Sequence, residues 1–123
     1  MECAFESTTN VYLGQWLVWS SLRTDAVCTI DNDRTRIRFL RSGVYLINLK
    51  VLYQKCSDDD VCRMELNLDG KPLQSCAFPT ATGSGVTSWY SLTVPVVEGQ
   101  VLTVKKRCHT YVPKASLTLT LVN

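Results

Sequence analysis

Alternation of side-chain character over residues 44–54 restricts the fold more than any other feature of this sequence. Aromatic or branched apolar residues occupy every second position: Tyr45, Ile47, Leu49, Val51 and Tyr53. The positions between them are mixed in character: Leu46, Asn48, Lys50 and Leu52. Successive side chains of a β-strand point to opposite faces, so this pattern predicts one long strand with a buried face. Apolar residues at helical spacing do not persist over three turns anywhere in the chain, and we therefore predict an all-β protein.

Shorter strands, separated by turn residues, are predicted along the rest of the chain. They cover residues 36–39, 64–68, 73–78, 89–97, 101–108 and 117–122. Asp69-Gly70 supplies the two positive-φ residues that a tight hairpin turn needs. Pro95 has no N–H to donate, so its strand is expected at a sheet edge or a bulge. The 123 residues suit a single domain over 1–123, with roughly eight to ten strands arranged as a jelly-roll or Greek-key β-sandwich.

Six cysteines are spread over the whole chain: Cys3, Cys28, Cys56, Cys62, Cys76 and Cys108. Zinc sites usually need closely spaced CxxC or CxxH pairs, which this chain lacks. An even number of dispersed cysteines favours disulfide bonds, which persist in oxidising compartments. We therefore predict a disulfide-stapled domain that works outside the cell.

Composition and charge argue against several other classes of protein. Apolar residues make up 46% of the chain, as in ordinary globular domains. The 13 basic and 11 acidic residues are interspersed and give a net charge of only +2, so we expect no nucleic-acid partner. No apolar stretch reaches about 18 residues, the length of a membrane-spanning helix. We expect a secretion signal or membrane anchor to lie outside this sequence.

Side chains suited to catalysis or metal binding are few. His109 is the only histidine, and its neighbours are Cys108 and Thr110, so we predict that the protein is not an enzyme. The acidic run 58–60 is interpreted as a solvated loop tip rather than a calcium site, and no cofactor or metal is expected. A basic stripe, Arg34, Arg36, Arg38 and Arg41, is interpreted as a solvated strand face rather than a glycan or receptor site. Of Trp16 and Trp19, we expect at least one to fill the core.

The central part of the chain resembles the tumour necrosis factor (TNF) ligand family. The run Ile37, Gly43-Val44-Tyr45-Leu46-Ile47 and Val51-Leu52-Tyr53 is similar to the segment in which that family places a glycine before a long aromatic-rich strand. The strand 89–97, the turn 98–100 and the strand 117–122 follow in the family's order, so the resemblance covers about residues 16–123. The spacing of Trp19-Ser20-Ser21, Cys28 and Gly43 is nearest to the branch that contains the ligand of the glucocorticoid-induced receptor. Complement-type globular heads share a similar strand and are the second family.

The resemblance implies a ten-stranded TNF-like jelly roll that assembles as a homotrimer, with a dimer as the alternative. It implies an extracellular cytokine, either the ectodomain of a type II membrane protein or its shed form. Such a ligand binds and clusters a TNF-receptor-family protein in immune signalling. The alternative function is that of a complement-type head, a calcium-dependent pattern- or protein-binding module.

The assembly residues implied by the resemblance are Leu46, Asn48, Lys50, Leu52, Trp89, Tyr90, Ser116 and Val122. Typical members of the family have aromatic side chains at the positions of Asn48 and Ser116. Three copies of Lys50 about 6 Å apart around an axis would repel by about 3 kcal/mol per pair at an effective dielectric constant of about 20. A tight trimer therefore requires Lys50 to turn outward or to find a partner.

Receptor contacts and disulfide pairs are also implied by the resemblance. The receptor-binding residues would be Arg23, Asp25, Asp58, Asp59, Asp60, Lys71, His109, Tyr111 and Lys114. The jelly-roll order of strands implies disulfides between Cys3 and Cys28, Cys56 and Cys76, and Cys62 and Cys108. The alternative pairs Cys56 with Cys62 and Cys76 with Cys108.

Overall fold

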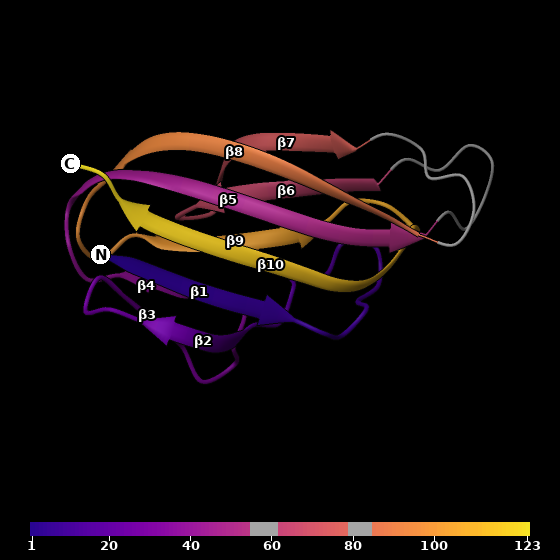
Figure 1. Ribbon diagram of the computed structural model, residues 1–123, viewed down its shortest axis with the longest axis horizontal. Coiled ribbons are helices and arrows are strands. Elements are labelled where there is room, and N and C mark those ends of the chain that lie inside the picture. The colour runs from indigo at the N-terminus through magenta and orange to yellow at the C-terminus, as the bar shows by residue number, and fades with distance from the viewer. Residues whose placement is uncertain (55–61, 79–84) are drawn as a thin grey trace.

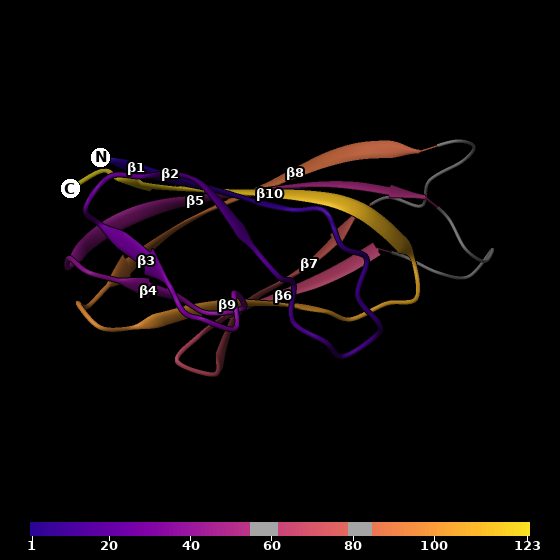
Figure 2. The same cartoon turned by 90° about the horizontal axis from the view of Figure 1, so that it is seen from below.

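The computed structural model describes residues 1–54, 62–78 and 85–123 of the chain as two packed antiparallel sheets (Figures 1 and 2). The strands are β1 (Glu2–Ser7), β2 (Ser20–Thr24), β3 (Cys28–Ile30), β4 (Ile37–Phe39), β5 (Gly43–Gln54), β6 (Cys62–Leu68), β7 (Lys71–Phe78), β8 (Val86–Val96), β9 (Val101–Lys106) and β10 (Tyr111–Leu121). The first sheet has the order β2-β1-β10-β5-β8, and the second has the order β3-β4-β9-β6-β7. The predicted all-β sandwich is confirmed. Nowhere in these three ranges is there a helix long and apolar enough to cross a membrane.

The core lies between the two sheets and is built on the alternation of β5. Tyr45, Ile47, Leu49, Val51 and Tyr53 are all buried, as their spacing predicts. The second sheet supplies the opposing layer: Met64 and Leu66 from β6 and Leu102 and Val104 from β9. Each such side chain contributes about 1.5–3 kcal/mol when it leaves water, so the inward faces of these strands dominate the stability of the sandwich.

Turns and sheet edges also follow the sequence. Asp69 and Gly70 have φ values of 52° and 78°, which confirms the tight turn between β6 and β7. Pro95 lies opposite Val44 on β8, the edge strand of the first sheet, where a missing N–H costs no ladder hydrogen bond. Gly43 packs so closely that a Cβ there would lie 2.6 Å from the backbone oxygen of Asn123. Only glycine fits at that position.

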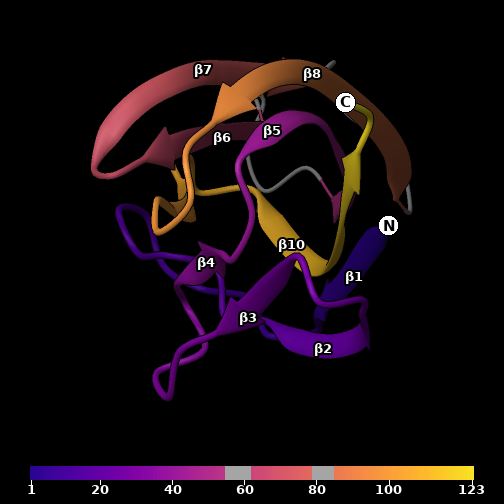
Figure 3. The same cartoon turned by 90° about the vertical axis from the view of Figure 1, so that its left-hand side faces the viewer.

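The N-terminal strand pairs with the C-terminal strand. β1 runs antiparallel to β10, with Glu2 opposite Thr120, so the two termini lie close together (Figure 3). Between β1 and β2, the segment 8–19 crosses from one sheet to the other. Trp19 at its end is fully buried, which confirms that at least one of the early tryptophans fills the core.

A buried lysine ties this crossing segment to the second sheet. Lys106 of β9 donates from Nζ to Asn10 Oδ1 at 2.8 Å and to the Val11 carbonyl at 2.9 Å. Farther along, the Leu17 N–H donates to the Val104 carbonyl at 2.8 Å, and Trp16 forms a β-bridge with Lys105. The segment therefore pairs with β9 on the same edge as the short strand β4, but farther along the strand.

Candidate functional site

The solvent-facing side of the first sheet gathers most of the residues expected in assembly. Lys50 on β5 lies opposite Ser116 of β10 on one side and Trp89 of β8 on the other. One row farther along the sheet, Asn48 lies between Thr118 and Ser91. We call this surface the first-sheet face; from the predicted set it carries Leu46, Asn48, Lys50, Leu52, Trp89 and Ser116. Val122 follows β10 as an exposed residue of the same alternation.

The placement of Tyr90 on that face is wrong. Tyr90 lies opposite Leu49, which is fully buried, and it packs against the core. Neighbouring residues of a strand point to opposite faces, so Trp89 and Tyr90 cannot share one surface. Trp89 is the residue on the solvent side, with 66% of its surface exposed.

Polar contacts dominate the first-sheet face. Lys50 Nζ lies 5.5 Å from the centroid of the Trp89 ring, within the range of a cation–π interaction. Ser91 donates a hydrogen bond to Asn48 Oδ1, and Lys114 pairs with Glu6 at 3.4 Å. A shallow hollow of about 250 Å³ lies beside Lys50, between Leu52 and Lys114. The face therefore offers hydroxyl, amide and ammonium groups around one large exposed aromatic.

Five of the predicted receptor residues lie at two opposite ends of the sandwich: Arg23, Asp25, His109, Tyr111 and Lys114. Arg23 and Asp25 lie at the end that holds the termini, where their side chains form an ion pair of 3.2 Å. The N–H of Glu2, followed by the Arg23 side chain, lowers the pKa of Asp25. His109, Tyr111 and Lys114 lie at the far end, where Tyr111 pairs with Gln54 at the end of β5. These two groups cannot contact one another.

Other predicted contacts fall elsewhere. Lys71 begins β7 in the second sheet and is exposed just after the turn at Asp69 and Gly70. Asp58, Asp59, Asp60 and Cys56 lie outside the described residues, as does the segment 79–84. The side chain of Cys76 is likewise outside the described part, so the expected pair Cys56 and Cys76 stays a prediction.

Cys3 and Cys28 form a buried thiol pair inside the sandwich. The Cys28 thiol interacts with that of Cys3, and burial, followed by the neighbouring Cys3, raises the pKa of Cys28. Cys3 donates its thiol hydrogen to the Asp25 carbonyl at 3.4 Å. These are the same two cysteines for which the jelly-roll order implies a disulfide, and that bond stays a prediction.

Cys62 and Cys108 form a second buried pair at the far end. A hydrogen bond from the Cys62 side chain, together with the Arg63 N–H at 3.1 Å and Thr110, lowers the pKa of Cys108 to about 6. β6 and β9 are hydrogen-bonded neighbours, which places the start of one beside the end of the other. The contact joins the two cysteines expected to pair, although the disulfide itself stays a prediction. Among the described residues, no three His, Cys, Asp or Glu side chains gather as metal ligands would.

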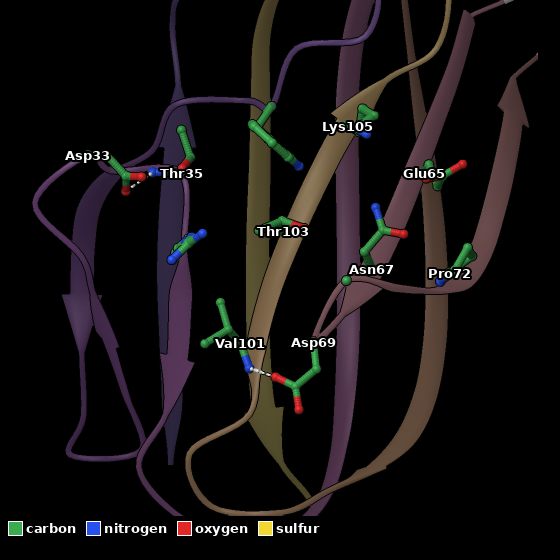
Figure 4. Close-up of a pocket in the computed structure, with 12 residues that line it drawn as sticks. Asp33, Thr35, Glu65, Asn67, Asp69, Pro72, Val101, Thr103 and Lys105 are labelled. Carbon is green, nitrogen blue, oxygen red and sulfur yellow. Dashed lines mark hydrogen bonds between the residues drawn. The ribbon is translucent and has the colours of Figure 1, made fainter.

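A larger hollow on the second sheet was missed by sequence reasoning. It has a volume of about 520 Å³ and lies over β6 and β9 (Figure 4). Arg36 lines it, although the sequence placed this residue in a solvated basic stripe along one strand. That stripe is not continuous: β4 contains only Arg38 of the four arginines, and Arg34 sits in a turn with φ of 62°. The one available signal was the polar alternation of Glu65, Asn67 and Asp69 before the hairpin turn.

Comparison with known proteins finds similar structures but no similar sequences. No known protein family and no curated protein sequence matches this chain. The globular domain of zebrafish complement 1qA aligns over 99% of this chain and 97% of its own, with a TM-score of 0.78 and 12% identity. Eiger TNF from S. frugiperda aligns over 100% of this chain and 93% of its own, with a TM-score of 0.74 and 12% identity. Rabbit GITRL aligns over 98% of this chain and 94% of its own, with a TM-score of 0.64 and 10% identity.

These similarities agree with the order of strands and with the two-layered packing. The rabbit GITRL structure is less similar than the other two, so no particular branch is distinguished. At such low identities the similarity concerns the backbone arrangement alone. The chain has the TNF-like jelly-roll fold, which it shares with TNF ligands and with complement globular domains.

Proposed function

We propose that this chain is a cytokine-type ligand of the TNF kind, which binds and clusters a cysteine-rich receptor of the TNF-receptor family outside the cell. It makes and breaks no covalent bond in doing so. The observation that carries the proposal is the first-sheet face, where Trp89 is 66% exposed beside Lys50 on a sheet otherwise packed against the core. Large exposed aromatic side chains are typical of interface anchors.

Assembly through the first-sheet face explains how receptors would be clustered. Copies of the chain meet at Trp89 and at the half-buried Leu46 and Leu52, while Asn48 and Ser116 supply hydrogen-bonding groups. Lys50 lies against the ring of Trp89 near the edge of the sheet, and this contact lessens the mutual repulsion of its copies. We expect a trimer, as the resemblance of residues 16–123 to the TNF ligand family implies.

Receptor contact is assigned to the far end of the sandwich. His109, Tyr111 and Lys114 are exposed there, and Tyr111 offers an aromatic side chain of the type enriched at binding hot spots. The acidic run 58–60 is also proposed as a receptor contact. Arg23 and Asp25, at the other end, form a second and separate contact.

Disulfide bonds follow from the proposed extracellular setting. Cys3 pairs with Cys28, and Cys62 with Cys108, because each thiol already interacts with the other of its pair. Cys56 pairs with Cys76 by the same strand order. Oxidation of each pair restricts the unfolded chain, which stabilises a small domain.

Sedimentation of the purified protein at micromolar concentration tests the assembly. The wild type is expected to sediment as a trimer and Trp89→Ala as a monomer, since the exposed ring is the main apolar group of the face. Tyr12→Ala removes another exposed aromatic, from the segment 8–19, and is the matched control. A wild-type protein that stays monomeric would refute assembly through this face.

Binding to immobilised ectodomains of the TNF-receptor family tests the partner. One member is expected to bind, and Tyr111→Ala is expected to weaken it by about tenfold or more, while Tyr12→Ala leaves it unchanged. If the whole panel fails to bind, the proposed function is wrong.

A complement-type binding module is the second candidate, favoured by the TM-score of 0.78 to the zebrafish complement 1qA globular domain. Calcium distinguishes the two functions. A rise in Tm on adding calcium, abolished by Asp59→Asn, supports the second candidate and counts against the first.

A further inference from the structure

The hollow on the second sheet has the size of a small-molecule site. Its volume of about 520 Å³ falls within the range of about 300–1,000 Å³ that such sites occupy. Its floor is made by β6 and β9, and its rim by the segment around Trp16, by the turn at Asp33 and by the hairpin turn at Asp69 (Figure 4). It lies on the opposite sheet from the proposed assembly face, so both surfaces can be occupied together.

A polar pair forms the middle of the floor. Asn67 of β6 lies directly opposite Thr103 of β9. Asn67 is only 5% exposed, and its amide rises from the strand toward the hollow (Figure 4). The amide carries two donors and an acceptor. Such a group, fixed in position and open to one side, is suited to a ligand that both donates and accepts.

An aromatic wall stands at one end of the hollow. Trp16 is 47% exposed, and its backbone is held by the β-bridge to Lys105. Lys105 Nζ lies 5.1 Å from the centroid of the indole ring, so the ammonium covers part of it. The ring remains a broad apolar surface that a ligand with a flat C–H face can contact.

Carboxylates and cations alternate around the rim. Asp33 accepts from the Thr35 N–H at 3.2 Å, and Asp69 accepts from the Val101 N–H at 2.9 Å (Figure 4). The Thr35 N–H lowers the pKa of Asp33, which keeps it ionised at neutral pH. With Glu65 the lining has three carboxylates against the two cations Arg36 and Lys105, so its net charge is −1.

This charge pattern limits the occupant. A net negative lining disfavours phosphate, sulfate and other anions. The three carboxylates do not gather as metal ligands would, because no such group is found in the described part of the chain. A neutral ligand rich in hydroxyl groups satisfies both the carboxylates, which accept, and the guanidinium, amide and ammonium groups, which donate.

We propose that this hollow binds a neutral saccharide unit, with its C–H face on Trp16 and its hydroxyls on Asn67, Thr103 and the rim carboxylates. The unit is either a free sugar or the end of a glycan chain. The site goes beyond the proposed receptor function and does not depend on it.

Saturation-transfer NMR with the methyl glycosides of glucose, galactose, mannose and N-acetylglucosamine tests the proposal. At least one is expected to bind with a dissociation constant on the order of 1 mM, the affinity expected of so small a ligand. Trp16→Ala is expected to weaken binding by about tenfold or more. Tyr12→Ala is the matched control, because it removes an exposed aromatic side chain of the same segment that does not line the hollow, and it leaves binding unchanged.

A second variant guards against loss of folding. Glu65→Gln keeps the size of the side chain and disturbs only a surface ion pair of 3.8 Å with Arg107. It is expected to weaken sugar binding by about threefold to tenfold, because a charge-assisted hydrogen bond becomes a neutral one. Unchanged circular dichroism would show that the fold is retained.

Three outcomes overturn the proposal. In one, no glycoside binds at tens of millimolar; in another, Trp16→Ala and Tyr12→Ala weaken binding equally. In the third, Trp16→Ala and Glu65→Gln weaken receptor binding while no sugar binds, which would make the occupant a polypeptide. Binding of free glycosides and of the same sugars on a carrier protein then distinguishes the two sources: equal affinities indicate a free sugar, and a preference for the carrier indicates a glycan.

Discussion

The two described cysteine pairs are almost equally buried and yet have opposite electrostatics. Cys28 is 3% exposed and Cys108 is 4% exposed. The pKa of Cys28 is raised, whereas that of Cys108 is lowered to about 6. Burial disfavours the thiolate in both places, so the difference comes from what else surrounds the sulfur. At Cys108 the Cys62 thiol, the Arg63 N–H and Thr110 all donate to it, and these hydrogen bonds outweigh burial.

The comparison shows that the order of the strands brings each cysteine pair together, whereas the groups around each sulfur determine its pKa. Both pairs bring distant parts of the chain together. The first pair sits among apolar core residues, where a thiolate has no donors to stabilise it. The second sits where β6 begins and the chain leaves β9, so backbone N–H groups outside the ladders remain available.

Removing a pair is expected to have the largest effect. In the oxidised protein, Cys62→Ala with Cys108→Ala should lower the free energy of unfolding by about 4 kcal/mol, and Cys3→Ala with Cys28→Ala by about 3.5 kcal/mol, because the first disulfide closes the longer loop. Urea unfolding of each double variant measures this. Wild-type protein that shows six reactive thiols after denaturation without reductant would contradict both disulfides.

Alkylation of the reduced protein should show the next largest difference. At pH 7 Cys108 is expected to react with iodoacetamide at least about tenfold faster than Cys28, because only Cys108 is mainly thiolate there. Their similar exposure means that access does not explain the difference. Mass spectrometry of tryptic peptides at a series of pH values measures both rates. Equal alkylation rates of Cys28 and Cys108 at pH 7 would show that the pKa values of the two thiols do not differ in this way.

Stability of the reduced protein should depend on pH with opposite signs for the two pairs. The folded-state pKa of Cys108 lies below the ordinary value of 9.0, so its contribution is present above pH 9 and is lost as pH falls toward about 6. The pKa of Cys28 is raised, so its contribution is present below pH 9 and is lost at higher pH. For Cys108, a shift from 9.0 to about 6 corresponds to no more than about 4 kcal/mol. Measured by urea unfolding, Cys108→Ala should not lose stability between pH 9 and about 6. Cys28→Ala should not lose stability above pH 9.

The smallest expected effect comes from a single donor at Cys108. Thr110→Val removes one hydrogen bond to the sulfur and keeps the volume, so the pH midpoint of Cys108 alkylation should rise by roughly one unit. Tyr45→Phe is the control at the other pair. It removes the 2.6 Å hydrogen bond to the Arg41 carbonyl and costs about 1 kcal/mol, but leaves Cys108 unchanged. A midpoint that does not move in Thr110→Val would show that Thr110 is not part of the effect.

Sequence reasoning succeeded where one strand carried its own pattern. The alternation of β5 and the turn at Asp69 and Gly70 are local features, and both were predicted. The strands before residue 36 were not delimited, since β1 and β3 are short and mixed in character. Tyr90 was assigned to the wrong face because the family resemblance placed two adjacent residues on one surface. β8 itself alternates, with Trp89 and Ser91 exposed and Tyr90 half-buried between them.

The surfaces were less predictable than the core because they depend on which strands become neighbours. The first-sheet face required only the alternation of β5 and the family order of strands. The hollow on the second sheet brings Asn67 and Thr103 together through the pairing of β6 with β9, and adds Trp16 from a segment that reaches the same edge. No local pattern in the sequence predicts that these three residues come together.

The pairing of β1 with β10 sets the order in which the chain can fold. Glu2 lies opposite Thr120, so β1 and β10 can pair only after nearly the whole stretch of chain between them is available. β2, which pairs only with β1 in the first sheet, depends on the same contact. These strands therefore join the first sheet through a pairing between opposite ends of this sequence. Such non-local pairing forms slowly, in about milliseconds to seconds, and leaves strand edges unpaired until it is complete.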